Sequence, residues 1–167
     1  MKYRSKKHRL PNAAYRGEKS VAFTVCVEGR KRPFVSNDMA EPQIAILFEA
    51  AEFHDCLNLV YCFMPDHLHV ILRGKSSTSN CKLAMDTFKY KSGVWFAQNA
   101  SNYAWQGEYY DHIIRGTEDL HAQIRYVASN PVRGDLVNCL LEYPFTGSGI
   151  GTLAEVLLDL EFARKFG

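Results

Sequence analysis

The sequence lacks the long apolar segments of a membrane protein. No apolar run approaches the roughly 18 residues that a membrane-spanning helix needs, so we expect no transmembrane segment. The N-terminus begins Met-Lys-Tyr-Arg and contains no apolar stretch of the kind that secretion machinery recognises, so we expect a cytoplasmic protein. Internal repeats and low-complexity tracts are absent too, which favours one compact domain for the 167 residues.

The cysteines lack the spacing of a metal or redox motif. There are five of them, irregularly placed, and no two form a CxxC pair, which argues against a zinc knuckle and a thioredoxin-type site. We expect them to be buried as small apolar side chains in a reducing compartment. They are Cys26, Cys56, Cys62, Cys81 and Cys139.

Charge is distributed unevenly along the chain. Residues 1–32 hold ten lysines and arginines against two acids, whereas the remaining 135 residues hold ten against sixteen. A basic N-terminal arm over 1–19 is typical of proteins that bind a polyanion, most often nucleic acid. We expect Lys6, Lys7 and Arg9 to contact the DNA backbone, and the alternative is a solvated tail.

The pattern of apolar residues predicts alternating strands and helices. We expect strands over 20–27, 57–63, 67–72 and 109–114, and helices over 37–54, 80–96, 117–129 and 153–162. Asn37 or Asp38 is expected to cap the first helix, Ser79 or Asn80 the second and the Thr117 hydroxyl the third, which Pro131 should end. This order predicts an α+β fold with a ferredoxin-like split βαβ core, an antiparallel sheet and packed helices. The domain would cover 20–146, followed by a tail over 147–167.

Two histidines on one expected strand are the first candidate site. His67 and His69 are two residues apart, so both side chains project from the same face of the strand, about 7 Å apart along it. Two imidazoles at this spacing can converge on a metal ion or a phosphate group. The spacing alone is also compatible with histidines that serve only the packing of the sheet.

A tyrosine and an asparagine on the third expected helix are the second candidate site. Tyr126 and Asn130 are four residues apart and therefore share one helical face. A metal held by two histidines and a neutral oxygen could polarise a phosphodiester, and a nearby phenol could then attack phosphorus. Tyr103 and the pair Tyr109 and Tyr110 are alternatives, but they fall in or beside an expected strand, where packing explains them.

Three blocks of the sequence stand out together. They are Met64-Pro65-Asp66-His67-Leu68-His69, Trp105-Gln106-Gly107-Glu108-Tyr109-Tyr110-Asp111-His112-Ile113-Ile114-Arg115 and Tyr126-Val127-Ala128-Ser129-Asn130-Pro131-Val132-Arg133-Gly134-Asp135-Leu136-Val137. These blocks resemble the REP-associated tyrosine transposases, a branch of the single-tyrosine HUH transposases that are similar to insertion sequence 200. They appear in the order typical of that family and extend the resemblance over about residues 15–146.

The resemblance implies a Mg²⁺- or Mn²⁺-dependent enzyme that cuts and rejoins single-stranded DNA near hairpins. It assigns the cation to His67 and His69, the nucleophile to Tyr126 and the third ligand to Asn130, where related transposases often have glutamine. Arg115 belongs to a motif of this branch and is a candidate DNA contact. The expected partner is single-stranded DNA with REP-like hairpins, and the expected assembly is a monomer or a homodimer.

Two other functions remain open on the sequence. The same fold could serve as a non-catalytic nucleic-acid-binding module, since fold alone does not determine function. A metal-dependent hydrolase that uses water as nucleophile is the other alternative. A covalent protein–DNA adduct would exclude both.

Overall fold

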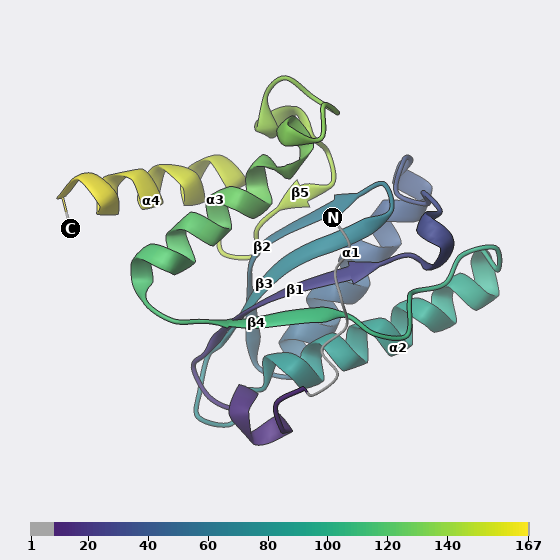
Figure 1. Ribbon diagram of the computed structural model, residues 1–167, viewed down its shortest axis with the longest axis horizontal. Coiled ribbons are helices and arrows are strands. Elements are labelled where there is room, and N and C mark those ends of the chain that lie inside the picture. Colours follow the sequence, from purple (N-terminus) through teal and green to yellow (C-terminus); the bar gives the residue numbers. More distant parts are fainter. Residues whose placement is uncertain (1–8, 167) are drawn as a thin grey trace.

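The computed structural model describes residues 9–166, with side chains described as far as Glu161. Helices and short 3₁₀ turns alternate with strands along the chain (Figure 1). The strands are β1 (Ser20–Cys26), β2 (Cys56–Met64), β3 (His67–Gly74), β4 (Tyr110–Ile114) and β5 (Thr146–Gly147). The α-helices are α1 (Asn37–Phe53), α2 (Cys81–Asn99), α3 (Thr117–Arg133) and α4 (Leu153–Phe166), and the 3₁₀ turns are η1 (Asn12–Tyr15), η2 (Glu28–Arg30) and η3 (Leu140–Glu142).

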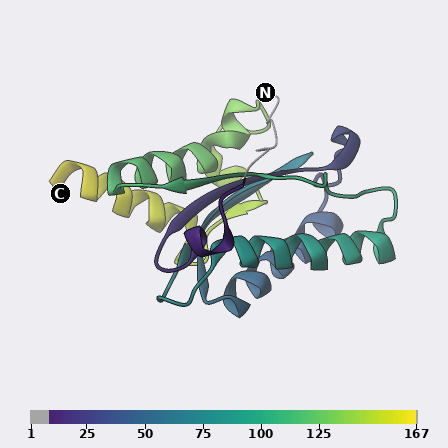
Figure 2. The same ribbon diagram turned by 60° about the horizontal axis from the view of Figure 1, so that its bottom comes forward.

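The five strands form one antiparallel sheet in the order β4-β1-β3-β2-β5. The elements from β1 to β4 follow one another as β1-α1-β2-β3-α2-β4, so the predicted ferredoxin-like split βαβ core is confirmed. Helices α1 and α2 pack together against one face of the sheet, while α3 lies on the opposite face and is contacted by α4 (Figure 2). The sheet therefore has helices on both sides.

Alternation along β3 assigns its residues to the two faces. Leu68 and Val70 are fully buried and lie on the face covered by α1 and α2, where the ring of Phe63 meets that of Phe88. His67 and His69 alternate with them in the sequence and point to the α3 face. One face of the strand thus supplies the apolar core and the other supplies polar groups.

Helix starts agree with the sequence prediction in one case of three. Asn80 caps α2, because its side-chain oxygen accepts a hydrogen bond from the backbone N–H of Leu83 (3.1 Å). Ser36, rather than Asn37 or Asp38, occupies the cap position of α1. Gly116 (φ +87°) precedes α3, so the Thr117 hydroxyl does not cap that helix as predicted. A glycine suits this position because positive φ is costly for other residues.

The prediction that Pro131 ends the third helix is wrong, since α3 continues to Arg133. Proline removes one helical N–H, and here it does so only in the last turn, where its ring is buried. The helix closes beyond it through the N–H of Gly134, which donates to Asn130 O (2.8 Å), and the N–H of Leu136, which donates to Pro131 O (2.9 Å). Burial and this closing turn outweigh the local preference of proline.

The described part of the expected basic arm packs against the sheet. Tyr15 is buried, and its hydroxyl donates to the carboxylate of Asp111 on β4. Nearby, Gly74 at the end of β3 approaches the backbone of Gly17 so closely that an added Cβ would lie 2.0 Å from the carbonyl oxygen of Gly17. Residues 9–19 are therefore continuous with the fold. Lys6 and Lys7 lie outside the described residues.

The remaining expectations concern the cysteines and the C-terminal segment. Cys26, Cys56, Cys62 and Cys81 are buried as predicted, but Cys139 is exposed because it precedes η3 in a surface loop. The segment from Thr146 onward adds β5 at the free edge of β2 and then α4, which extends beyond the expected 153–162. Among the described helices none is both long and apolar enough to cross a membrane.

Candidate active site

The imidazoles of His67 and His69 converge on the α3 face of the sheet. A tight turn of Pro65 and Asp66 joins β2 to β3, so that β3 begins with His67. The two Nε2 atoms are 3.1 Å apart, and the rings are nearly perpendicular, at 89°. The fold thus brings together the Nε2 atoms of the two histidines that the sequence spacing singled out.

The Nδ1 atom of each imidazole lies within hydrogen-bonding distance of a different polar side chain. Nδ1 of His67 donates to Oδ1 of Asp66 (2.6 Å), and Nε of Arg30 donates to the other oxygen of that carboxylate (2.9 Å). Nδ1 of His69 is 2.9 Å from the Thr24 hydroxyl on β1. Because an ionised carboxylate only accepts hydrogen bonds, the proton of neutral His67 is on Nδ1 and its Nε2 carries a lone pair. Such outer partners orient the histidines of metal sites.

Both imidazoles are neutral at neutral pH. Burial lowers the pKa of His69 to about 3, and the neighbouring His67 and the Arg133 guanidinium act in the same direction. Burial also lowers the pKa of His67, against the opposing effect of the hydrogen bond and charge of Asp66. Neutral histidine is the form that binds metal ions.

The geometry of the histidine pair fits a divalent cation. Two ligands at neighbouring corners of an octahedron, each about 2.1 Å from the ion, are about 3.0 Å apart. The observed separation of 3.1 Å between the Nε2 atoms is close to this value. No cluster of three or more His, Cys, Asp or Glu side chains able to hold a metal occurs in the described part of the chain. Further ligands would have to be an amide oxygen, water or phosphate.

Tyr126 lies beside His69, as the sequence predicted. Helix α3 packs over β2 and also touches β3, which brings the Tyr126 ring centroid to 6.5 Å from that of His69. The tyrosine side chain keeps 45% of its surface exposed, so a DNA strand can reach it. The chain brings these two residues together from elements 57 positions apart in the sequence.

Asn130 lies one helical turn from Tyr126, and the side-chain oxygen of Asn130 faces Arg133. Its Oδ1 accepts a hydrogen bond from Nη2 of Arg133 (2.7 Å), while its Nδ2 is buried and makes no hydrogen bond. An amide oxygen has a second lone pair that a cation could use. Its role as third ligand is therefore compatible with the structure and stays a prediction.

Arg133, like Thr24 and Arg30, is a residue of this site that the sequence alone did not single out. It contacts Tyr126, Ser129 and Asn130 at once. The spacing of Tyr126, Asn130 and Arg133, at i, i+4 and i+7, is that of one helical stripe and could have indicated it. The prediction that Pro131 ends the helix concealed this signal.

The other candidate tyrosines, Tyr103, Tyr109 and Tyr110, make contacts within the fold. Tyr109 is buried, its hydroxyl donates to Asp86 (2.6 Å), and burial raises its pKa. Tyr103 packs against Phe96, with ring centroids 6.1 Å apart. Tyr110 is half-buried on β4, opposite Thr24 in the sheet register, and so is the nearest alternative to Tyr126.

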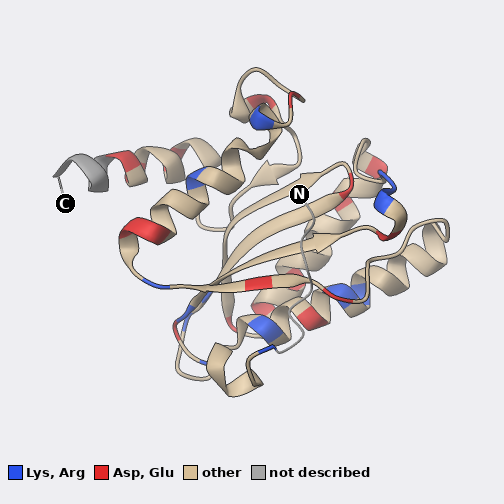
Figure 3. Ribbon diagram, in the orientation of Figure 1, with Lys and Arg blue, Asp and Glu red and all other residues tan. Residues whose placement is uncertain are grey.

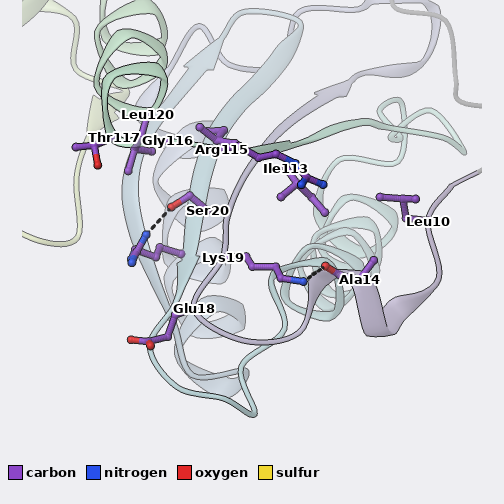
Figure 4. A pocket seen from close by; sticks show the side chains of 12 residues that line it. Leu10, Ala14, Glu18, Lys19, Ser20, Ile113, Arg115, Gly116, Thr117 and Leu120 are labelled. Carbon is purple, nitrogen blue, oxygen red and sulfur yellow. Dashed lines mark hydrogen bonds between the residues drawn. The ribbon is translucent and has the colours of Figure 1, made fainter.

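The two described basic residues that were predicted to contact DNA are in different settings. The guanidinium of Arg9 lies over the Tyr109 ring, 3.8 Å from its centroid, and donates to Tyr109 O (2.8 Å), so Arg9 fastens the N-terminal segment to β4. Arg115 is exposed and lines a groove of about 550 Å³ together with Lys19 and Arg73 (Figure 4). This groove lies where β1 begins and β3 ends, away from His67.

Acidic and basic residues are interspersed along the elements of the described part of the chain (Figure 3). The strongest local excess of positive charge therefore belongs to residues 1–32, as the composition indicated.

Comparison with known proteins identifies the family and agrees with the fold. A family model described as "Transposase IS200 like" matches residues 19–130, which contain both histidines, Tyr126 and Asn130. A Haemophilus influenzae protein named as a REP-associated tyrosine transposase is 22% identical over 145 residues, covering 80% of this chain and 82% of its own.

Solved structures show the same fold. One is a REP-associated tyrosine transposase bound to a REP hairpin, with TM-score 0.70 and 20% identity over 86% of this chain and 82% of its own. Another is a Deinococcus radiodurans protein described as a transposase, with TM-score 0.51 and 19% identity over 75% of this chain and 96% of its own. Since the family match spans well over half of the residues and includes the histidine pair and the helix tyrosine, the chain belongs to the IS200-like transposase family.

Proposed function

We propose that this protein is a metal-dependent endonuclease and strand transferase that acts on single-stranded DNA near hairpins. The observation that carries the proposal is the position of the half-exposed Tyr126 next to His69, whose Nε2 converges with that of His67. A phenol beside a neutral imidazole pair is suited to phosphoryl transfer. Packing of the sheet alone would not require the imidazoles of buried His69 and half-buried His67 to face each other.

His67 and His69 would hold the cation, and Asn130 would be its third protein ligand. The orientation of both imidazoles by Asp66 and Thr24 and the separation of their Nε2 atoms support this assignment. Oxygen ligands from water and phosphate would favour Mg²⁺ or Mn²⁺. Once bound, such an ion neutralises charge that develops on the phosphate during the reaction.

Tyr126 would be the nucleophile. Its Oη loses its proton to water, which reaches the half-exposed side chain, and forms a bond to phosphorus. The bond between phosphorus and the 3′-oxygen breaks, and that oxygen takes up a proton. The products are a 5′-phosphotyrosine and a free 3′-hydroxyl. Attack by a 3′-hydroxyl on the phosphotyrosine reverses these steps and joins strands without a high-energy cofactor.

Basic residues would hold the DNA by its backbone. The relative of similar fold was solved with a REP hairpin, which supports hairpin DNA as the ligand class. Lys6 and Lys7 would contribute from the N-terminal segment, and Arg115 from the groove that it shares with Lys19 and Arg73. Arg9 would act beside them, and its contacts with Tyr109 fasten this segment to the sheet.

The test is a search for a covalent adduct. The protein is incubated with hairpin-bearing single-stranded DNA and Mn²⁺, denatured and analysed by gel and mass spectrometry. We expect an adduct that maps to Tyr126 and disappears in Tyr126→Phe, a change that removes one oxygen and almost no volume. Tyr110→Phe is the matched control and should still form the adduct.

The other outcomes identify the alternatives. DNA binding without cleavage would show a non-catalytic binding module. Cleavage without any adduct would show water as the nucleophile, and an adduct on another tyrosine would refute the assignment of Tyr126. Full cleavage in excess chelator would refute the metal site.

A further inference from the structure

Arg133 reaches back along α3 to the tyrosine that the proposed function makes the nucleophile. Because the helix continues through Pro131, Arg133 stands seven residues after Tyr126 and three after Asn130, on the same helical stripe. Had the helix ended at Ser129, this side chain would have left the stripe. The continuation of α3 is thus what adds a guanidinium to the site.

The guanidinium of Arg133 contacts both residues at once. Its central carbon lies 3.7 Å from the Tyr126 ring centroid, which is a close cation–π contact. Nη2 donates to Oδ1 of Asn130 (2.7 Å) and to the backbone oxygen of Tyr126 (2.8 Å), and Nε donates to the Ser129 hydroxyl (3.2 Å). A planar group that stacks on one side chain and donates to another fixes their relative orientation.

The ordinary role of such an arginine does not account for these contacts. A basic residue in the last turn stabilises a helix by its charge near the C-terminal carbonyls, wherever its side chain points. Arg133 instead folds back over the Tyr126 ring and contributes its positive charge to the surroundings of His69. Arg133 is exposed, yet its guanidinium is directed toward Tyr126 and Asn130.

We propose that Arg133 is a positioning residue, which holds the Tyr126 phenol and the Asn130 amide in the arrangement required for attack on phosphorus. The proposal rests on the proposed function, because it gives the arginine a role in the reaction of Tyr126. Holding reacting groups in place lowers the entropic barrier of a reaction. Loss of Arg133 should therefore slow the chemical step more than it weakens DNA binding.

The kinetic test compares Arg133→Met, Arg133→Lys and the wild type in single-turnover adduct formation with hairpin DNA and Mn²⁺. Methionine keeps much of the side-chain length but loses the charge and the donors. We expect the rate at saturating DNA to fall by about 10- to 100-fold in Arg133→Met, in line with the cost of misplaced reacting groups. Lysine, which keeps the charge but not the planar fork, should recover part of the rate.

A matched control separates this effect from a general loss of charge. Arg125→Met removes a positive charge from the same helix, one residue before Tyr126, and should keep a rate close to that of the wild type. The dissociation constant for hairpin DNA should change by less than about threefold in Arg133→Met, because few phosphate contacts are lost. Melting temperatures identify any variant that fails to fold, in which case Arg133→Lys carries the test.

A second readout does not depend on cleavage. With 3-fluorotyrosine in place of tyrosine and the Tyr126 signal assigned through Tyr126→Phe, the ¹⁹F resonance reports the surroundings of that ring. We expect it to move and broaden in Arg133→Met and to stay in place in Arg125→Met. An unchanged resonance, or an unchanged rate, would overturn the proposal.

Two further outcomes are also decisive. Equal losses of rate and DNA affinity with a shallower salt dependence would make Arg133 a phosphate contact and overturn the positioning role. If the wild type formed no adduct, the proposed function would fail by itself. In that case the fluorine signal would show only whether the arginine still orders the ring.

Discussion

The hydroxyl of Thr24 on β1 lies 2.9 Å from Nδ1 of His69 on β3, and the two residues are direct partners in the sheet register. Both are buried on the face covered by α3. The strand pairing itself therefore delivers the polar group that orients the imidazole.

Replacing Thr24 with valine removes this hydroxyl at almost constant volume. Loss of the group that hydrogen-bonds to the non-coordinating nitrogen of a metal-binding histidine typically weakens metal affinity by about 10- to 100-fold. We expect a weakening of this order for Mn²⁺ in Thr24→Val, measured by titration of the free-ion electron paramagnetic resonance signal without DNA. Ser20→Ala removes a hydroxyl from the other end of the same strand and should leave the affinity unchanged. Equal affinities in all three proteins would contradict the role of Thr24.

Acid should destabilise the fold through His69. The unfolded chain binds a proton at this residue with a pKa of about 6.5, whereas burial lowers the native pKa to about 3. Between these values the unfolded state holds the extra proton, so stability rises with pH and falls on acidification, by up to about 1.4 kcal/mol per pH unit for one group. Above about pH 6.5 this contribution no longer changes.

Urea unfolding at pH 7.5 and pH 5 measures this effect. The loss of stability between the two pH values should be smaller in His69→Asn than in the wild type, because the group responsible has been removed. His112→Asn, at an exposed position on β4, is the matched control and should keep the wild-type difference. The same difference in His69→Asn would show that other groups cause the acid sensitivity.

Deletion of residues 1–8 should make DNA binding less sensitive to salt. It removes Lys2, Arg4, Lys6 and Lys7, and each lost phosphate contact lowers the slope of log affinity against log salt by about 0.7 on single strands. Arg9 is kept because its contacts with Tyr109 belong to the fold. Fluorescence anisotropy with hairpin DNA at several salt concentrations gives the slope. An unchanged slope would mean that these residues do not touch the backbone.

Gly74→Ala should disrupt the junction between β3 and the segment before β1. The added Cβ would lie 2.0 Å from the carbonyl oxygen of Gly17, so the backbone has to move. Overpacking of this kind costs about 1–3 kcal/mol, and more where backbone must shift. Gly93→Ala, on α2 with open space around its Cα, should instead stabilise the protein by up to about 1 kcal/mol. Chemical denaturation of both variants measures the contrast, and equal stabilities would contradict it.

Much of the fold could be predicted because its signals are local. Alternation placed His67 and His69 on one face, helical spacing did the same for Tyr126 and Asn130, and Asn80 caps α2 as expected. These features depend on residues a few positions apart, which a single sequence displays.

The remaining features depend on contacts between distant segments. Pro131 continues a helix because its ring is buried and the turn after it closes on Asn130 and Pro131. The partnership of Thr24 and His69 requires the register of two strands 45 residues apart. Arg133 could enter the site only once the helix was known to extend that far.

The alternation along β3 also has a consequence for how this protein can change over time. Leu68 and Val70 are part of the buried core, and His67 and His69, next to them in the sequence, hold the cation in the proposed function. Substitutions of Leu68 or Val70 would mainly change thermostability, and substitutions of His67 or His69 would mainly change the proposed reaction. Both pairs lie in one short segment of the chain. A lineage could therefore lose the histidines and keep an intact DNA-binding scaffold, or vary its core and keep the reaction.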